Sequence, residues 1–274
     1  MTESNVSAGF LERLRNAAAV NNSWLMIGLD PVLDRLPDGI SRDAEGVVTF
    51  NRAIIEATQD LVIGYKPNAA FYEVIGAVGW DALARTRKLI SGDLVALLDA
   101  KRGDIGTTSE MYAQAIFDNL GFDAATVSPY VGREGIQPFL DRKERGVFVL
   151  CRTSNRDGSL QDVVVESGER LYEEVARLAP LWGDNVGLVV GATDTGALPE
   201  LREMCPDVPF LLPGVGTQGA GAKQTLRLAA DWDGNLAVIA LSRSIIYASD
   251  GRDFADVARA RAQDVIREMR EAFS

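Results

Sequence analysis

The clearest sign of the fold is the segment Leu94-Val95-Ala96-Leu97-Leu98-Asp99-Ala100-Lys101-Arg102-Gly103-Asp104-Ile105. Its first five residues form a continuous apolar run, which is typical of a strand buried in a parallel sheet. Side chains two apart on a strand point to the same side, so Asp99 and Lys101 are expected to leave this strand on one face. The sequence therefore predicts a charged pair at the end of a buried strand. Such a pair is either a structural ion-pair network or part of a functional site.

Similar apolar runs recur along the chain and alternate with helix-like segments, as in the βαβ units of a parallel sheet. We expect eight strands, at residues 24–29, 61–65, 94–98, 124–127, 147–151, 186–190, 209–212 and 236–241. Helices are expected to follow them at residues 47–58, 69–90, 108–119, 133–145, 168–182, 197–205, 219–229 and 254–273. Eight such units in 274 residues predict an α/β protein with a (β/α)8 TIM barrel that occupies one domain, residues 1–274.

One more helix is expected outside these eight units. Residues 10–20 precede the first strand and are expected to cover the bottom of the barrel. The alternative architecture is a doubly wound open sheet, which normally carries a glycine fingerprint after its first strand when it binds a dinucleotide. Gly28-Leu29-Asp30-Pro31 is not such a fingerprint, so the barrel is favoured.

The composition limits the partners and the cellular location that we expect for this protein. A formal net charge of −11 argues against a general surface for nucleic acid or anionic membrane, which needs clustered Lys and Arg. No apolar run approaches the roughly 18 residues of a membrane helix. Residues 1–9 lack the charged and apolar regions of a signal peptide. With only Cys151 and Cys205, both expected in the core, a cytoplasmic protein without a disulfide framework is predicted.

The chain contains no histidine. This absence excludes Ser-His and Cys-His nucleophiles, histidine bases and the usual histidine-containing zinc sites. Acid–base chemistry is therefore left to Lys, Asp, Glu, Tyr or Cys.

Charged residues fall at the ends of the first three predicted strands. Asp30 ends the first, Lys66 the second, and Asp99 with Lys101 the third. In a TIM barrel the carboxyl ends of the strands form the active site, so these four side chains are expected to converge at the mouth. The convergence favours a site over four unrelated surface charges.

The residues after Lys101 predict the start of a helix. Thr107 and Glu110 have the S/T-x-x-E spacing of a capping box. Asp104 lies just before them and either favours the positive end of this helix or belongs to the site.

A phosphate group is the ligand predicted for the loops after the seventh and eighth strands. Pro213-Gly214-Val215-Gly216-Thr217-Gln218-Gly219 allows close backbone approach and opens a helix, and Arg243 in Ser242-Arg243-Ser244 supplies a cation. Barrels commonly hold phosphate in these two loops. The polar loop 152–159 is either a cover for the ligand or an ordinary surface loop.

These motifs resemble those of the orotidine 5′-phosphate decarboxylase family, in particular bacterial members whose third strand ends in Asp-Ala-Lys-Arg-Gly-Asp-Ile-Gly, here residues 99–106. The similarity extends through Gly28-Leu29-Asp30, Tyr65-Lys66-Pro67-Asn68, Pro213-Gly214-Val215-Gly216 and Ser242-Arg243-Ser244. It implies a homodimeric carboxy-lyase that converts orotidine 5′-phosphate to uridine 5′-phosphate and carbon dioxide in pyrimidine biosynthesis, with no metal and no organic cofactor.

The resemblance also implies roles for single residues. Lys66, Asp99, Lys101 and Asp104 match the catalytic Lys-Asp-Lys-Asp tetrad, with Asp104 reaching the site of the partner subunit. Lys101 is expected to stabilise and protonate the carbanion formed at carbon 6. Substrate contacts are implied for Asp30 and Lys66 at the ribose, Thr108 across the dimer, Ser154 and Pro213 near the base, Gln218 and Arg243 at the phosphate, and Ile105.

One departure from the family pattern lies in the loop after the fifth strand. A proline and a glycine are expected soon after Ser154-Asn155, and Arg156-Asp157-Gly158 stands there instead. The length and conformation of this loop are therefore expected to differ.

Two other functions fit part of the pattern. A metal-dependent sugar-phosphate decarboxylase, aldolase or synthase of the same superfamily would hold magnesium with an acidic group near the end of the second strand, where Lys66 stands here. A non-catalytic barrel that senses a phosphorylated ligand would keep Gln218 and Arg243 but would not need Asp99 and Lys101.

Overall fold

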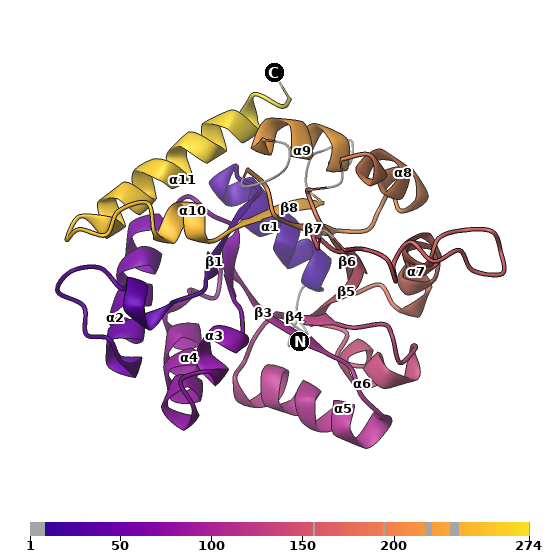
Figure 1. The fold of residues 1–274 in the computed structure, drawn as a ribbon, viewed down its shortest axis with the longest axis horizontal. Coiled ribbons are helices and arrows are strands. Elements are labelled where there is room, and N and C mark those ends of the chain that lie inside the picture. The colour runs from indigo at the N-terminus through magenta and orange to yellow at the C-terminus, as the bar shows by residue number, and fades with distance from the viewer. Residues whose placement is uncertain (1–8, 156, 194, 217–220, 231–235, 274) are drawn as a thin grey trace, which may run out of the picture.

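The strands form a closed parallel barrel. The computed structural model describes residues 9–155, 157–193, 195–216, 221–230 and 236–273 (Figure 1). Strands pair in chain order from β1 to β8, and β1 also pairs with β8, with Leu25 opposite Ile239. The predicted (β/α)8 TIM barrel is confirmed, and the open sheet is wrong because the first and last strands are hydrogen-bonded.

The strands lie close to their predicted positions. They are β1 (Leu25–Leu29), β2 (Gly64–Pro67), β3 (Val95–Arg102), β4 (Ala124–Val127), β5 (Gly146–Arg152), β6 (Val186–Val190), β7 (Phe210–Pro213) and β8 (Ala237–Leu241). Strands β4 and β6 have the predicted bounds. Strand β2 begins later than predicted and includes Lys66, and β3 continues past its predicted end to Arg102. Both differences place charged residues inside strands rather than after them.

Helices surround the barrel (Figure 1). They are α1 (Phe10–Asn21), α2 (Ala44–Thr58), α3 (Ala70–Glu73), α4 (Ala77–Leu89), α5 (Gly106–Ala113), α6 (Gln137–Leu140), α7 (Leu171–Leu178), α8 (Ala197–Met204), α9 (Ala222–Ala229), α10 (Arg243–Ile246) and α11 (Phe254–Arg270), with short 3-10 or π turns at Leu33–Arg35, Gln114–Asn119, Glu134–Ile136 and Ala179–Trp182. No helix among the described residues is both long enough and apolar enough to cross a membrane.

Several predicted helices differ from the observed ones, and the helix expected at 133–145 is only a 3-10 turn followed by α6, which ends at Leu140. The helix expected at 69–90 is divided into α3 and α4, because Gly76 adopts a φ of +78°, which interrupts a right-handed helix. The capping box at Thr107 and Glu110 is wrong, since α5 begins at Gly106 with Ile105 as its N-cap. Glu110 instead pairs with Arg142 at 2.9 Å, because a guanidinium is a stronger partner for a carboxylate than a backbone N–H.

Helix α1 closes the bottom of the barrel, as predicted for residues 10–20. Its apolar residues pack on side chains that point into the barrel, and the rings of Phe10 and Phe148 meet edge to face with centroids 5.8 Å apart. The buried residues of this cluster are Phe10, Leu14, Ala17, Ala18, Met26, Ile63, Val95, Leu97, Ala124, Phe148, Val189, Leu211, Val238 and Ala240. The inner core is therefore completed by a segment from outside the eight βα units.

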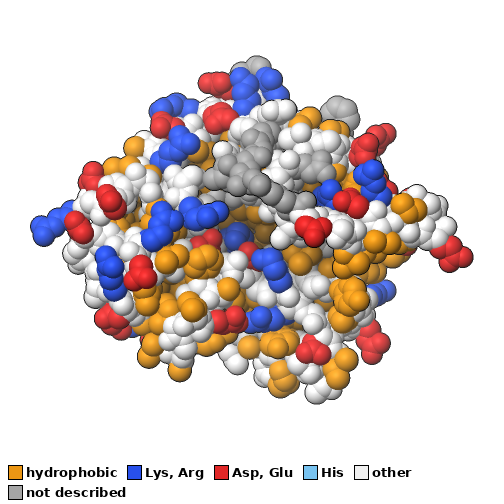
Figure 2. Space-filling model, viewed as in Figure 1, with side chains coloured by type: hydrophobic (Ala, Val, Ile, Leu, Met, Phe, Trp, Pro, Cys, Tyr) orange, Lys and Arg blue, Asp and Glu red, His pale blue; other side chains and the backbone are white. Residues whose placement is uncertain are grey.

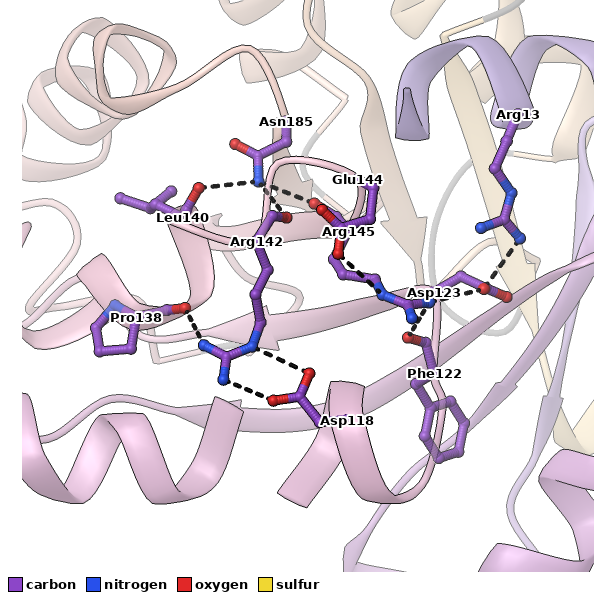
Figure 3. A network of polar contacts seen from close by, with 10 residues as sticks. All are labelled: Arg13, Asp118, Phe122, Asp123, Pro138, Leu140, Arg142, Glu144, Arg145 and Asn185. Atoms are coloured by element: carbon purple, nitrogen blue, oxygen red, sulfur yellow. Dashed lines mark hydrogen bonds and ion pairs between the residues drawn. The ribbon is translucent and has the colours of Figure 1, made fainter. Parts of the chain in front are cut away.

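A buried carboxylate fastens α1 to this end of the barrel. Asp123, directly before β4, is 2% exposed and lies 2.9 Å from Arg13 of α1 and 3.4 Å from Arg145 (Figure 3). It also lies 3.5 Å from Arg87. Arg145 directly precedes β5, so the contacts lie at the amino ends of the strands. In TIM barrels this end serves stability rather than catalysis.

We expect the Asp123→Ala variant to lower the free energy of unfolding by about 3 kcal/mol, because it leaves three guanidiniums without their shared carboxylate. Urea denaturation measures this loss. Asp118→Ala is the control, since Asp118 is half-exposed beside Arg142 and its removal should cost less than about 1 kcal/mol. Equal losses in the two variants would show that Asp123 does not fasten the bottom of the barrel.

Candidate active site

The structure brings the predicted charges of the first three strands together at the carboxyl end of the barrel. Lys66 lies on β2, Asp99 and Lys101 lie on β3, and Asp30 directly follows β1. Figure 2 shows a hollow near the centre of one face, with acidic and basic side chains inside it. Hydrogen bonds and ion pairs link these residues through Asp99 and Asn68, so they form one charged cluster rather than four separate surface groups.

Asp99 is the centre of this cluster. Its Oδ1 lies 2.5 Å from Lys101 Nζ and accepts a hydrogen bond from Thr126 Oγ1 at 2.9 Å. Its Oδ2 accepts from Lys66 Nζ at 3.2 Å and from Asn68 Nδ2 at 3.1 Å. Each carboxylate oxygen thus contacts one ammonium and one neutral donor.

The charges of this cluster hold one another ionised. Burial alone would raise the pKa of Asp99, but the ammonium groups of Lys66 and Lys101 and the hydroxyl of Thr126 lower it to about 2. Burial alone would lower the pKa of Lys66, but the carboxylates of Asp99 and Asp30 raise it above the ordinary lysine value. Lys66 and Asp99 are therefore both charged at neutral pH.

Lys101 reaches Asp99 by an unexpected backbone path. Its φ is +48°, in the left-handed region, and the pairing of β3 with β4 shifts register between Leu98 and Arg102. The predicted meeting of Asp99 and Lys101 is observed, but regular strand alternation is the wrong reason for it. The side chain of Lys101 remains 49% exposed, so it is accessible from solvent.

Asn68 links two acids of the site and was missed as a site residue. Its backbone N–H donates to Asp30 Oδ1 at 3.2 Å, while its side-chain amide donates to Asp99. Asn68 Oδ1 accepts from Ala70 N at 3.1 Å, which fixes the orientation of the amide. The available signal was its place two residues after Lys66, on the same side of the strand end.

Asp104 does not join the cluster within one chain. Its Oδ1 accepts from Ile105 N at 2.7 Å, and among the described residues no cation pairs with it. A single chain therefore provides only the Asp99 carboxylate beside Lys101. Ile105 is 73% exposed, and Thr108 lies on α5, so neither belongs to the cluster of Asp99.

Of the substrate contacts predicted in the later loops, Ser154, Pro213 and Arg243 lie in the described part of the chain. A Cβ built on Gly214 would lie 3.3 Å from Ser154 Cβ, so the loop after β5 lies against the end of β7, whose last residue is Pro213. Arg243 begins α10 with its side chain exposed. Gln218 lies outside the described residues.

The loop after β5 is tied to the residues that follow it. Arg152 pairs with Asp162 at 2.6 Å, and Thr153 N donates to Gln161 Oε1 at 2.9 Å. Arg156 lies outside the described residues. These contacts fix the start of the loop beside Ser154.

A closed (β/α)8 barrel with paired lysines and an ionised aspartate at its mouth is typical of enzymes that use acid–base chemistry. The chain belongs to the family described as Orotidine 5′-phosphate decarboxylase / HUMPS family, which matches residues 25–256. The family predicted from the sequence is thereby confirmed.

Relatives match nearly the whole chain. It is 50% identical over 258 residues to orotidine 5′-phosphate decarboxylase of Herpetosiphon aurantiacus, covering 93% of this chain and 95% of the relative. It is 51% identical over 270 residues to the enzyme of that name from Thermomicrobium roseum, covering 96% of both. The solved structure of Leishmania donovani OMP decarboxylase is 37% identical, with a TM-score of 0.85 and coverage of 97% of this chain and 100% of that one.

The lowered pKa of Asp99 predicts a pH dependence of stability. A carboxyl whose folded pKa is about 2 instead of 3.8 contributes stability that is present above about pH 5 and is lost as the pH falls toward about 2. Over this range the wild-type free energy of unfolding should fall by about 2 kcal/mol more than that of Asp99→Asn. Urea denaturation at a series of pH values measures the difference. The exposed Asp34→Asn is the control and should follow the wild type, whereas parallel curves for Asp99→Asn would refute the assignment.

Proposed function

We propose that this chain, as a single domain, converts orotidine 5′-phosphate to uridine 5′-phosphate and carbon dioxide in pyrimidine biosynthesis, without a metal or an organic cofactor. The observation that carries the proposal is the ionised cluster of Lys66, Asp99 and Lys101 at the barrel mouth. Relatives about half identical to this chain and named orotidine 5′-phosphate decarboxylase support the same reaction.

The chemistry requires a positive charge beside one carbon atom. When the bond between carbon 6 and the carboxylate breaks, its electron pair stays on carbon 6, in the plane of the ring and out of conjugation with the carbonyls. The ammonium of Lys101 stabilises this pair electrostatically and then donates a proton to it. The neutral amine regains a proton from solvent, which reaches the half-exposed Lys101 in the free enzyme. Asp99 keeps the ammonium in place.

The remaining proposed roles concern binding. Asp30 and Lys66 contact the ribose hydroxyls, and Arg243 contacts the phosphate with a side chain that is exposed and forms no ion pair among the described residues. Phosphate binding lies away from the bond that breaks, so its binding energy serves orientation as well as affinity. The other proposed contacts are Ile105, Thr108, Ser154, Pro213 and Gln218.

The main alternative is a magnesium-dependent reaction on a sugar phosphate. Lys66 argues against it, because its ammonium lies where such an enzyme needs an acidic ligand. Burial alone would lower the pKa of Lys66, but the flanking carboxylates of Asp99 and Asp30 raise it, so this ammonium stays charged. The positive charge of the Lys66 ammonium would repel a divalent cation at this point.

We propose that the active enzyme is a homodimer in which Asp104 completes the site of the partner subunit. Asp104 has no cation partner among the described residues of its own chain. Exposed apolar side chains lie on the segments that follow β3 and β4, where a partner would cover them. They are Ile105 (73% exposed), Met111 (54%), Tyr130 (80%) and Val131 (49%).

A cytoplasmic location is also proposed. Cys151 and Cys205 are both free and buried, and burial raises the pKa of the Cys151 thiol to about 12. Unpaired thiols suit a reducing compartment.

The Lys101→Ala variant tests the proposed reaction. It should lower decarboxylation of orotidine 5′-phosphate by roughly 1,000-fold or more, because both charge stabilisation and the proton donor are lost. The fall in substrate absorbance measures the rate, and circular dichroism checks that the variant is folded. Lys88→Ala, which removes an exposed lysine of α4, is the control and should keep the wild-type rate. Near-normal turnover by Lys101→Ala would overturn the mechanism.

Mixing two inactive variants tests the shared site. In a heterodimer of Lys101→Ala and Asp104→Ala, one site lacks both residues and the other has both. Unfolding and refolding the two together should therefore restore roughly a quarter of the wild-type activity, since random pairing makes half of the dimers mixed. Each variant refolded alone is the control. A mixture that stays inactive although mixed dimers form would show that Asp104 does not serve the partner subunit.

A further inference from the structure

Thr126 forms hydrogen bonds with both residues of the ion pair between Asp99 and Lys101. It is the polar residue of the otherwise apolar strand β4, and it is 1% exposed. Its Oγ1 donates to Asp99 Oδ1 at 2.9 Å and accepts the backbone N–H of Lys101, also at 2.9 Å. One buried hydroxyl thus touches the carboxylate of Asp99 and the peptide of Lys101.

The backbone of Lys101 needs such a support. A long side chain at a φ of +48° is strained relative to a right-handed conformation, so it persists only where neighbouring groups hold it. The register shift between β3 and β4 removes regular pairing at this position. The hydroxyl of Thr126 provides the partner that the Lys101 N–H needs.

The chemistry of a hydroxyl sets the direction of both bonds. It has one hydrogen to donate, and the ionised Asp99 can only accept, so the hydrogen points to Asp99. An oxygen lone pair is then left for the Lys101 N–H. The two contacts therefore act together, and loss of the hydroxyl removes both.

We propose that Thr126 is a positioning residue for proton transfer: it holds the left-handed backbone of Lys101 and the carboxylate of Asp99 so that the Lys101 ammonium faces carbon 6 of the substrate. The proposal rests on the proposed role of Lys101. Within the described part of the chain, the side-chain hydrogen bonds of Thr126 go to Asp99 and to the Lys101 N–H, and none goes to Asp30, Lys66 or Arg243. Loss of Thr126 should therefore slow the chemical step more than it weakens binding.

The test compares three variants. Thr126→Val keeps the shape and removes the hydroxyl, and Thr126→Ser keeps the hydroxyl. Thr58→Val is the matched control, since Thr58 is also fully buried and forms two hydrogen bonds, to Ile54 O at 2.7 Å and Tyr65 Oη at 2.8 Å, at the end of α2. For each we would measure kcat and KM for orotidine 5′-phosphate, the Kd of uridine 5′-phosphate and the urea midpoint. If Thr126→Val does not fold, Thr126→Ala takes its place.

Thr126→Val should lower kcat roughly tenfold or more, with KM and the Kd of uridine 5′-phosphate within about twofold of wild type. Thr126→Ser should restore kcat to within about threefold of wild type. Thr58→Val should lose stability but keep kcat. Wild-type kcat in Thr126→Val, an equal loss in Thr126→Ser, or a kcat loss of the same size in Thr58→Val would overturn the proposal.

Failure of the role proposed for Thr126 can be distinguished from failure of the proposed function. If wild type does not decarboxylate the substrate, or if Lys101→Ala retains turnover, the proposed reaction or the role of Lys101 fails whatever Thr126 does. If Lys101→Ala is inactive and Thr126→Val is normal, only the role of Thr126 fails.

Discussion

The carboxylate of Asp99 is the group on which the barrel mouth depends. It is 12% exposed and contacts two ammoniums, an amide and a hydroxyl. A buried charge is tolerated only where partners of this kind replace water. Lys66 lies on β2 and Asn68 directly follows it, while Lys101 lies on β3 and Thr126 on β4. The order of these strands in the barrel therefore assembles the site.

At each end of the barrel one buried aspartate contacts several cationic side chains, but the two clusters serve different purposes. At the bottom, Asp123 gathers three arginines, whose guanidiniums stay protonated and form several directed hydrogen bonds. At the mouth, Asp99 gathers two lysines, whose amines can release a proton. A cluster built from arginine therefore fastens helix α1 permanently, whereas one built from lysine can take part in acid–base chemistry.

Much of the fold follows from hydrophobic pattern alone. The bounds of β4 and β6 and the helix that closes the bottom were predicted because buried strands and amphipathic helices leave strong periodic signals. The pairing of Asp99 with Lys101 was predicted too, but regular alternation could not reveal the left-handed backbone of Lys101, which depends on the register of β4. Asn68 and Thr126 were missed as site residues for a related reason. Their roles arise from contacts between strands, and a polar residue in an apolar strand indicates only that some partner exists.

In the proposed reaction, protein charges alone, with Lys66 where a magnesium-dependent enzyme would hold its metal, suffice for decarboxylation. The most direct measurement is turnover of orotidine 5′-phosphate by wild-type enzyme treated with EDTA, followed by loss of substrate absorbance in metal-free buffer. The rate should equal that of untreated enzyme and should not rise when magnesium is added. Loss of turnover on EDTA treatment, with recovery on addition of magnesium, would contradict the account.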